Sequence, residues 1–556
     1  MPPRFLAQFV EREPRMRKWL ILIVLVGVFG SGALIFVPGL RSTKMSARPR
    51  RLPSGDREIA WLHNPTAFET WQNFVWGVKR AEMSGDGDPD GLSIDDSGAF
   101  PDKTTAVPEL VIRRTGFAGA LRIRWYKVTD ATTQEDWVNA LARNNPPPLA
   151  ILGGWSSDRA RTLADAMRDA NWVAARPLLF LTTATADKVD PDEVDGARGD
   201  LGPNLISVYD RSFRFCFTNR QMADSVTDYV FSDPTLRPGP IVWPGLRAVG
   251  TSVASAWVGI ATLAANSFPP TESIPAYAIE WRDDPYSTDL SFKFRESLQH
   301  RAGALAYLPQ LAMTTHSVPF STGRYTRPNP AEAQVAEHIL ANLPPPGMRS
   351  VLVIPTVSAP ARRTLRTLVQ GDPSAGRQLV ALTGDGMGVN TFFRDREFAW
   401  PTRSIAIPLV LFTHADPFGW DAPGSPSPPP LGYELSAPGA GLMRSSTEDI
   451  RLYTRLTRVV TSAAFPNGDP AIVGSSDMLN NRLRNLTPAF FASTGDRLSG
   501  TGEHVVVLRP GFSITPMQGK SNPDGVLEVY ARVSGNSGWI RVHSRPLSRA
   551  DGGSQE

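Results

Sequence analysis

The stretch that most constrains the fold is residues 148–187, because it carries the pattern of a complete β–α–β unit. Residues 149–152 form an apolar run typical of a buried parallel strand, and the turn 153–158 follows it. Apolar positions then recur at helical spacing before a second apolar run at 177–181. Parallel strands joined through a helix need a crossover, which is right-handed in nearly all proteins. The stretch therefore predicts an α/β fold built on parallel sheets.

Small hydroxyl side chains follow both of these predicted strands. Ser156 and Ser157 stand in the first turn, and Thr183 and Thr185 come after the second strand. Small ligands bind at the carboxyl edge of open parallel sheets, and hydroxyls beside free N–H groups at a helix N-terminus suit an anion. The same residues could serve only as helix caps, the ordinary role of Ser and Thr at such turns. We expect this edge to be the floor of a binding site, with capping as the alternative.

Length and charge limit the protein's class. A chain of 556 residues with 41% apolar and 20% charged residues indicates a globular protein of two or three domains. The net charge is +4, but residues 1–51 carry ten Lys or Arg and two Glu, so the rest of the chain is negative overall. We therefore expect no nucleic-acid partner. The single cysteine, Cys216, excludes an intramolecular disulfide, a cysteine metal cluster and a lipoprotein anchor.

An uncharged apolar segment, residues 19–37, is long enough for one bilayer span of roughly 20 residues. A cleaved signal peptide is the alternative, but the apolar region is long for one and has no clean small-x-small cleavage site. We expect an uncleaved signal anchor in the inner (cytoplasmic) membrane, with residues 1–18 as a short cytoplasmic tail and the folded body on the periplasmic or extracellular side. Residues 38–57 are then a basic, proline-containing linker. A second uncharged segment, 248–268, is weighed as a second span, but it is rich in small residues and is expected to be a buried helix or helical pair.

Patterns for catalysis, metal binding and cofactor binding are incomplete. Residues 86–91 begin a calcium-loop pattern, but the twelfth position is Ser97 where that loop requires Glu, so a solvated acidic turn is expected. Neither H-E-x-x-H nor G-x-S-x-G occurs, and the turn 384–388 has glycine spacing that differs from the dinucleotide fingerprint. His414 and Asp416 lie near a predicted strand end, where a loop histidine is usually structural. We expect no catalytic site, no metal and no cofactor.

The order of several segments along the chain carries a family resemblance. These segments are AILGGWSSDRA, PLLFLTTATAD, FRFCFTNRQMADSVTDYV, AIEWRDDPYSTDL, LVALTGDGMGVNTFF, GVLEVYARV and GWIRV. Their order and spacing resemble the type I periplasmic-binding-protein fold, in particular the Leu/Ile/Val-binding-like, receptor ligand-binding branch of ABC-transporter substrate-binding proteins. The resemblance implies two Rossmann-like lobes with parallel sheets joined by a hinge, here preceded by one transmembrane helix.

The resemblance also implies where a ligand is held. In the family, a Gly/Ser turn holds the ligand carboxylate, a Ser/Thr turn adds to it, and a tyrosine of the second lobe commonly closes over the ligand. Members that bind amino acids use an acidic residue in the second lobe, whereas the corresponding residues 355–359 contain no carboxylate, so an α-amino acid is not the expected ligand. The candidate ligand-binding residues are Trp155, Ser156, Ser157, Thr183, Thr185, Tyr286 and Asp385.

The expected division of the body alternates between the lobes. The first lobe comprises 58–235 and 378–470, with a Pro-rich loop at 419–439. The second comprises 236–377, with an insertion at 238–272, and 471–556, which includes a C-terminal β segment. The expected function is that of a membrane-tethered extracytoplasmic solute-binding protein that captures a small polar or carboxylate ligand for an ABC permease. The alternative is a sensory or protein-interaction ectodomain on the same fold, acting with a membrane sensor.

Overall fold

A computed structural model describes most of the folded body. The described residues are 47–83, 91–103, 105–189, 204–241, 273–282, 284–304, 310–319, 329–387, 405–417, 447–466, 470–486, 491, 494–498, 503–510, 525–532 and 538–546. The predicted span at 19–37, the start of the acidic turn, the segment 248–268 and the 419–439 loop lie outside them. Within the described ranges, no helix is both long and apolar enough to cross a membrane.

The first lobe is built on a seven-stranded sheet with the order β2-β3-β4-β1-β5-β6-β7. The parallel strands are β4, β1, β5, β6 and β7, and β3 and β2 extend the sheet as antiparallel strands. The strands are β1 (Arg57–His63), β2 (Leu92–Asp95), β3 (Glu109–Arg114), β4 (Leu121–Lys127), β5 (Ala150–Leu152), β6 (Leu178–Leu181) and β7 (Ser212–Arg214).

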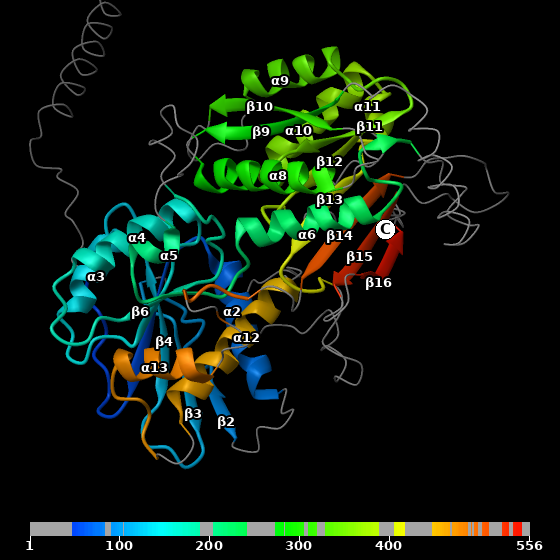
Figure 1. The fold of residues 1–556 in the computed structure, drawn as a ribbon. Coiled ribbons are helices and arrows are strands. Elements are labelled where there is room, and N and C mark those ends of the chain that lie inside the picture. Colours follow the sequence, from blue (N-terminus) through cyan, green and yellow to red (C-terminus); the bar gives the residue numbers. More distant parts are fainter. Residues whose placement is uncertain are drawn as a thin grey trace, which may run out of the picture.

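Helices cover both faces of this sheet, as Figure 1 shows. One face packs against α2 (Phe68–Met83), α12 (Thr447–Ala464) and α13 (Ser476–Leu486). The other packs against α3 (Gln134–Ala142), α4 (Ser157–Asp169) and α5 (Leu205–Val208). The predicted β–α–β unit is thus confirmed as β5, α4 and β6, with α4 burying an apolar face that recurs every three or four residues.

The second lobe is built on a nine-stranded sheet whose main order is β10-β9-β11-β12-β13-β14-β15-β16, with β8 paired to β11. Strands β9 to β13 run parallel and β14 to β16 complete the sheet in antiparallel fashion. The strands are β8 (Gly239–Pro240), β9 (Ile274–Arg282), β10 (Leu311–Pro319), β11 (Met348–Val353), β12 (Leu379–Thr383), β13 (Leu409–Thr413), β14 (His504–Pro510), β15 (Gly525–Arg532) and β16 (Trp539–Pro546). The predicted C-terminal β segment is confirmed.

Helices also cover both faces of the second sheet (Figure 1). On one face lie α6 (Asn219–Ser232) and α8 (Pro285–Ala304), which pack against each other. On the other lie α9 (Pro330–Ala341), α10 (Ser358–Gly371) and α11 (Ala375–Gln378). The molecule therefore has two α/β lobes, each with its own hydrophobic core.

The chain crosses between the lobes three times: after β7, after β13 and after α13. These crossings differ from the sequence-based division in three respects. Helix α13, expected in the second lobe, packs on the first, because the chain returns to the second sheet only after it. Helix α6, expected in the first lobe, packs on the second, because the chain leaves the first sheet directly after β7. Strands β12 and β13, also expected in the first lobe, pair in the second sheet, because the short crossover through α10 places β12 beside β11.

Candidate functional site

The first candidate wall of the site is the carboxyl edge of β5. Gly154 makes the turn with φ +70°, and a Cβ there would lie 2.5 Å from Cα of Ala160 in α4, so only glycine fits. Ser156 is the N-cap residue of α4, but its side chain makes no capping hydrogen bond. The N–H groups of the first helical turn have no acceptor within the helix. The capping alternative therefore does not account for Ser156, a half-buried residue at the N-terminus of α4.

The other candidates on this lobe have different roles. Ser157 is buried, and its Oγ accepts a hydrogen bond of 3.3 Å from the N–H of Ala186, which joins the turns after β5 and β6. Thr183 is exposed, whereas Thr185 is fully buried. Trp155 stacks on His63 at the end of β1, with ring centroids 4.8 Å apart. Ser156, Trp155 and Thr183 are thus the candidates with exposed surface on the first lobe.

His63 is an uncharged part of this wall. Its Nδ1 accepts a hydrogen bond of 2.9 Å from the N–H of Asn64. Burial lowers the pKa of His63 to about 4, because the charged imidazolium would lose its hydration there. The aromatic pair of His63 and Trp155 therefore presents no charge at neutral pH.

On the second lobe, Tyr286 lies in the first turn of α8 and points into its own lobe. Its hydroxyl accepts a hydrogen bond of 2.9 Å from the N–H of Gly386, in the turn after β12. A Cβ on Gly384 or Gly386 would lie 2.8 or 3.0 Å from that hydroxyl oxygen, so the two glycines make room for the phenol. Burial, followed by the charge of Asp385, raises the pKa of Tyr286 well above its usual value. Closure of this side chain over the first-lobe hydroxyls, which the resemblance implied, is not seen.

Asp385 is paired with a histidine at the end of β13. Its Oδ2 lies 2.7 Å from Nε2 of His414. Nδ1 of His414 accepts a hydrogen bond of 3.3 Å from the N–H of Phe217, so the ring proton is on Nε2 and is donated to Asp385. Because Phe217 belongs to the first crossing, this pair connects the β12 turn to the hinge. The sequence pointed to His414 only as a residue near a strand end, and its acidic partner could not be read from spacing.

Asn219 links the two lobes, and sequence reasoning missed it. Its backbone N–H donates to the carbonyl oxygen of Thr185 at 2.8 Å, and its Nδ2 donates to the carbonyl oxygen of Tyr286 at 3.3 Å. The same Nδ2 donates to Oδ2 of Asp289 at 2.9 Å, which also accepts from the N–H of Asp187 at 2.8 Å. Thr185, Tyr286 and, through Tyr286, Asp385 are thereby brought together. The only available signal was the position of Asn219 directly after the capping residue of a predicted amphipathic helix.

The N-terminal ends of α4 and α8 lie close to each other across the lobes. Helix α4 packs against α8. Oδ1 of Asp284 accepts a hydrogen bond of 3.2 Å from the N–H of Tyr286, which caps α8. The pKa of Asp284 is raised to about 7, mainly by burial and also by the charge of Asp158 in the first turn of α4. Two helix N-termini, each with partial positive charge, therefore meet at the interlobe edge.

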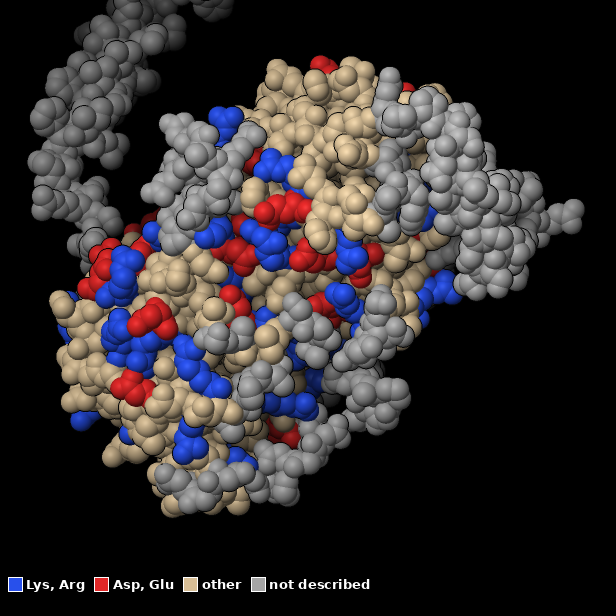
Figure 2. Space-filling view, in the orientation of Figure 1, with Lys and Arg blue, Asp and Glu red and all other residues tan. Residues whose placement is uncertain are grey.

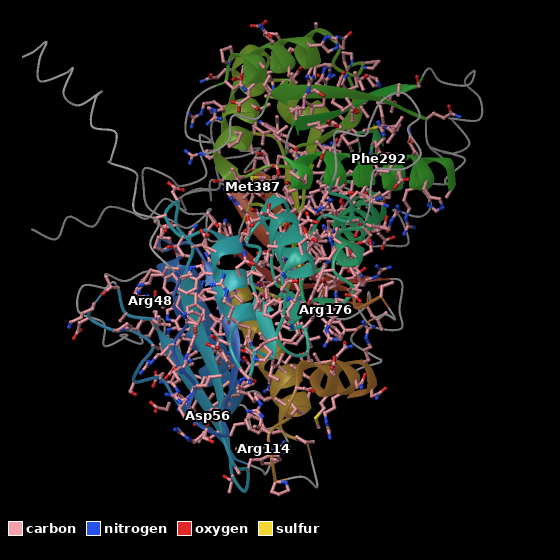
Figure 3. The ribbon with its side chains drawn as sticks, turned by 90° about the vertical axis from the view of Figure 1, so that its left-hand side faces the viewer. Arg48, Asp56, Arg114, Arg176, Phe292 and Met387 are labelled. Carbon is pink, nitrogen blue, oxygen red and sulfur yellow. The ribbon has the colours of Figure 1, made fainter. Side chains whose placement is uncertain are left out.

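Charged side chains gather in a band where the lobes meet, over α6 and α8 (Figure 2). Many are ion-paired, for example Arg220 with Glu296 at 2.8 Å and Arg301 with Asp228 at 2.5 Å. The electrostatic fields of two opposite charges this close together largely cancel at larger distances. In a second view, Met387, which follows the Asp385–Gly386 turn, lies at the level where the lobes meet (Figure 3).

Comparison with known proteins gives structural likeness only. No protein-family model matches the chain, and no curated protein matches it significantly. An ABC transporter substrate-binding protein from Desulfitobacterium hafniense is 12% identical, with a TM-score of 0.44, over 82% of this chain and 98% of its own. A leucine-binding protein from Thermotoga maritima is 11% identical, with a TM-score of 0.42, over 88% and 99%. A solute-binding protein from Rhodopseudomonas palustris HaA2, in complex with p-hydroxybenzoic acid, is 9% identical, with a TM-score of 0.44, over 90% and 100%.

These neighbours are Leu/Ile/Val-binding-like and related ABC-transporter substrate-binding proteins, the group to which the sequence resemblance pointed. The two-lobe architecture follows from the chain's own strand order and crossings.

Proposed function

We propose that this chain is a solute-binding protein that captures a small carboxylate-bearing molecule between its two lobes. The observation that carries the proposal is the hydroxyl of Ser156, which makes no capping bond although it stands at the N-terminus of α4. A hydroxyl and the N–H groups of a first helical turn together form a site for one carboxylate. The site lies at the carboxyl edge of β5, where α4 approaches the N-terminus of α8 in the other lobe.

The second lobe supplies the shape of the site. The hydroxyl of Tyr286 is engaged by Gly386, and the carboxylate of Asp385 by His414. Because these groups already have partners within the lobe, they form a fixed wall against which the ligand's remaining atoms are selected. The nearby carboxylates of Asp158 and Asp284 disfavour a second negative charge on the ligand. A monocarboxylate with a neutral body is therefore the proposed substrate class.

Two lobes joined by three crossings can open and close as rigid bodies, and a ligand that contacts both lobes selects the closed state. The structure contains two hydrogen bonds that need the lobes to be close, from Asn219 to Thr185 and from Asp187 to Asp289. We take these bonds to define the closed arrangement.

The membrane tether and the transporter belong to the same proposal and rest on the sequence. Residues 19–37 would anchor the chain in the inner membrane, and a permease would receive the ligand. In support, the end of the linker is docked on the first lobe, where Nη1 of Arg124 donates to the carbonyl oxygen of Arg50 at 2.8 Å. The twelve residues between the span and Arg50 reach at most about 43 Å when fully extended. The first lobe would thus stay near the bilayer.

The test is the thermal unfolding of the full-length chain with a set of small monocarboxylates. At least one should raise the midpoint in a concentration-dependent way, because a ligand that binds only the folded state stabilises it. Ser156→Ala should remove most of the shift. Ser475→Ala is the control, because Ser475 is a half-buried serine that directly precedes α13 on the same lobe, and its variant should keep the shift.

Two results would count against this function. If no monocarboxylate shifts the midpoint, the chain fits the interaction ectodomain better than a solute receptor. If a carboxylate shifts it equally in wild type and Ser156→Ala, the ligand is held elsewhere.

A further inference from the structure

Asp289 is a buried acid of α8 at the place where the two lobes meet. It is 3% exposed, and its helix packs against α6 of its own lobe and against α4 of the first lobe. Its Oδ2 accepts a hydrogen bond of 2.8 Å from the N–H of Asp187, which follows β6 of the first lobe. This bond crosses between the lobes, so the first lobe supplies part of the surface that buries Asp289. Opening the lobes breaks the bond and returns the carboxyl group to water.

The immediate surroundings of Asp289 favour the uncharged acid. Its Oδ2 accepts a second hydrogen bond, of 2.9 Å, from Nδ2 of Asn219, whereas Oδ1 is buried and has no hydrogen-bond partner within the described residues. A carboxylate with one oxygen buried and unsolvated is costly, and taking up a proton removes its charge. Burial, followed by the charge of Asp187, accordingly raises the pKa of Asp289 to about 7.

The charged groups of the second lobe around Asp289 do not reverse this preference. Lys293, four residues later on α8, favours the charged form of Asp289, as does the hydrogen bond from Asn219. The ammonium group of Lys293, however, also lies 3.6 Å from a carboxylate oxygen of Glu296. Arg220 of α6 is paired with Glu296 as well, at 2.8 Å. Burial and the charge of Asp187 therefore outweigh the one nearby cation.

On the side of the first lobe, the nearest cation is already engaged. Nη1 of the fully buried Arg214 lies 3.5 Å from Oδ1 of Asp187. Its Nε lies 3.1 Å from Oδ1 of Asp496, in the third crossing between the lobes. One guanidinium is thus shared by two acids, so it does not offset the charge of Asp289 as a third.

The charged residue of α4 that faces α8, Asp158, acts on a different acid. Its charge contributes to the raised pKa of Asp284, directly before α8. The side chain of Asp158 is 57% exposed, so water screens its charge. The hydrogen bond that Asp284 accepts from the N–H of Tyr286 stays within the second lobe. Of these two acids of the second lobe, Asp289 is the one that accepts a hydrogen bond from the first.

We propose that closing the lobes places one proton on Asp289, so that a fall in pH favours the closed arrangement. With the lobes open, the carboxyl group is in water and ionised at neutral pH. As they close, it takes a proton from the solvent, and the proton returns when they part. The closed arrangement binds more protons, so its population rises as the pH falls. The switch rests on the proposed opening and closing of the lobes, but needs neither Ser156 nor a bound carboxylate.

The experiment measures the distance between the lobes in the full-length chain without ligand. Spin labels are attached to Asp169→Cys in α4 and Glu337→Cys in α9, both at exposed positions. The closed fraction is followed from about pH 8 to about pH 6. A pKa of about 7 in the closed arrangement, against a usual value of about 4 in the open one, predicts a roughly tenfold rise in the ratio of closed to open molecules.

Asp289→Asn is the sharpest variant, because the amide is close in shape to the protonated acid and carries no charge. At about pH 8 its closed fraction should match or exceed that of the wild type at about pH 6, and it should no longer depend on pH. Asp210→Asn is the control, since Asp210 is an exposed acid directly before β7, at the amino edge of the first sheet, and should keep the wild-type response.

A second variant keeps the test valid if Asp289→Asn does not fold. Asp187→Asn removes the facing charge and keeps the N–H that binds Asp289, so its closing transition should move to lower pH.

Three outcomes overturn the proposal. A closed fraction that is the same at both ends of the pH range shows that closing binds no proton. A response that Asp289→Asn retains assigns the proton to another group, such as a histidine, which titrates in the same range. A closed fraction that falls with the pH reverses the sign. Solute capture is tested separately, by the thermal shift with carboxylates and its loss in Ser156→Ala, so each proposal can fail alone.

Discussion

The carboxyl edges of the two lobes are made alike but use their polar groups differently. On the first lobe, the hydroxyl of Ser156 makes no capping hydrogen bond, and the first N–H groups of α4 have no helical acceptor. On the second lobe, Tyr286 is engaged by Gly386, and Asp385 by His414. At the first edge, hydrogen-bonding groups remain available to a ligand. At the second edge, they are already bonded to neighbours within the lobe.

The position of a polar residue at a sheet edge does not by itself make it a ligand contact. A group already paired in its own lobe stabilises the wall, and its removal should cost folding free energy. A group without a partner costs little to remove but should matter for binding. Variants at the two edges separate these two consequences.

The largest effect is expected at the turn that builds the first edge. Gly154→Ala combines a backbone at φ +70° with a Cβ only 2.5 Å from Cα of Ala160. We expect the free energy of unfolding to fall by about 3 kcal/mol or more, from strain and overpacking together. Gly116→Ala is the control, since Gly116 has φ +83° but no atom within 4 Å of the place its new methyl group would take, and should lose about 1 kcal/mol. Denaturant unfolding gives both values, and equal losses would refute the close approach of α4.

A smaller loss of stability is expected for Tyr286 at the second edge, and the smallest loss for Ser156 at the first edge. Tyr286→Phe leaves the N–H of Gly386 without its acceptor, which should cost about 1 to 2 kcal/mol of unfolding free energy. Ser156→Ala should change stability by less than about 0.5 kcal/mol, because no capping bond is lost. Denaturant unfolding of both variants checks the ranking. A loss in Ser156→Ala as large as a helix cap, about 1 kcal/mol, would restore the capping interpretation.

The two regions should also respond to pH with opposite sign. The folded pKa of His63, about 4, is below its unfolded value, so its contribution is present above about pH 6.5 and is lost as the pH falls through 4. The folded pKa of Asp289, about 7, is above its unfolded value, so its contribution is present below about pH 4 and is lost as the pH rises through 7. Each effect should amount to about 3 to 4 kcal/mol at most.

The free energy of unfolding, measured across this pH range in a variant of each residue, distinguishes the contribution of His63 from that of Asp289. His63→Phe should remove the loss on the acid side and keep the stack with Trp155, while Asp289→Asn should remove the loss towards neutral pH. A pH profile unchanged by either substitution would show that the group in question is not buried as described.

The sequence predicted the first edge better than the second for a physical reason. The turn at 153–158 and α4 follow from local patterns: glycines, hydroxyls and apolar residues at helical spacing. The lobe to which α6 and β12 belong depends on where the chain crosses between the lobes. A helix that follows a strand has the same sequence pattern whether it packs on that strand's sheet or on the other sheet. The orientation of Tyr286 depends on space above Gly384 and Gly386, which only the folded chain reveals.

The pairing of Asp385 with His414 illustrates the same limit. Both residues were visible near predicted strand ends, but they are 29 positions apart and meet because β12 and β13 are neighbours in the sheet. The local sequence pattern predicted that each residue lies at a sheet edge, whereas the order of the strands in the sheet determines which residues are in contact.

The most direct test of ligand capture between the lobes is the distance between them, measured with paired spin labels. Cys216 is fully buried, and burial raises its pKa to about 12, so labels would attach to cysteines introduced at the exposed positions Asp169 in α4 and Glu337 in α9. We predict that a carboxylate which raises the thermal midpoint also narrows the distance distribution towards its closed value, and that Ser156→Ala loses this response at the same concentration. An identical distribution with and without bound carboxylate would contradict capture between the lobes.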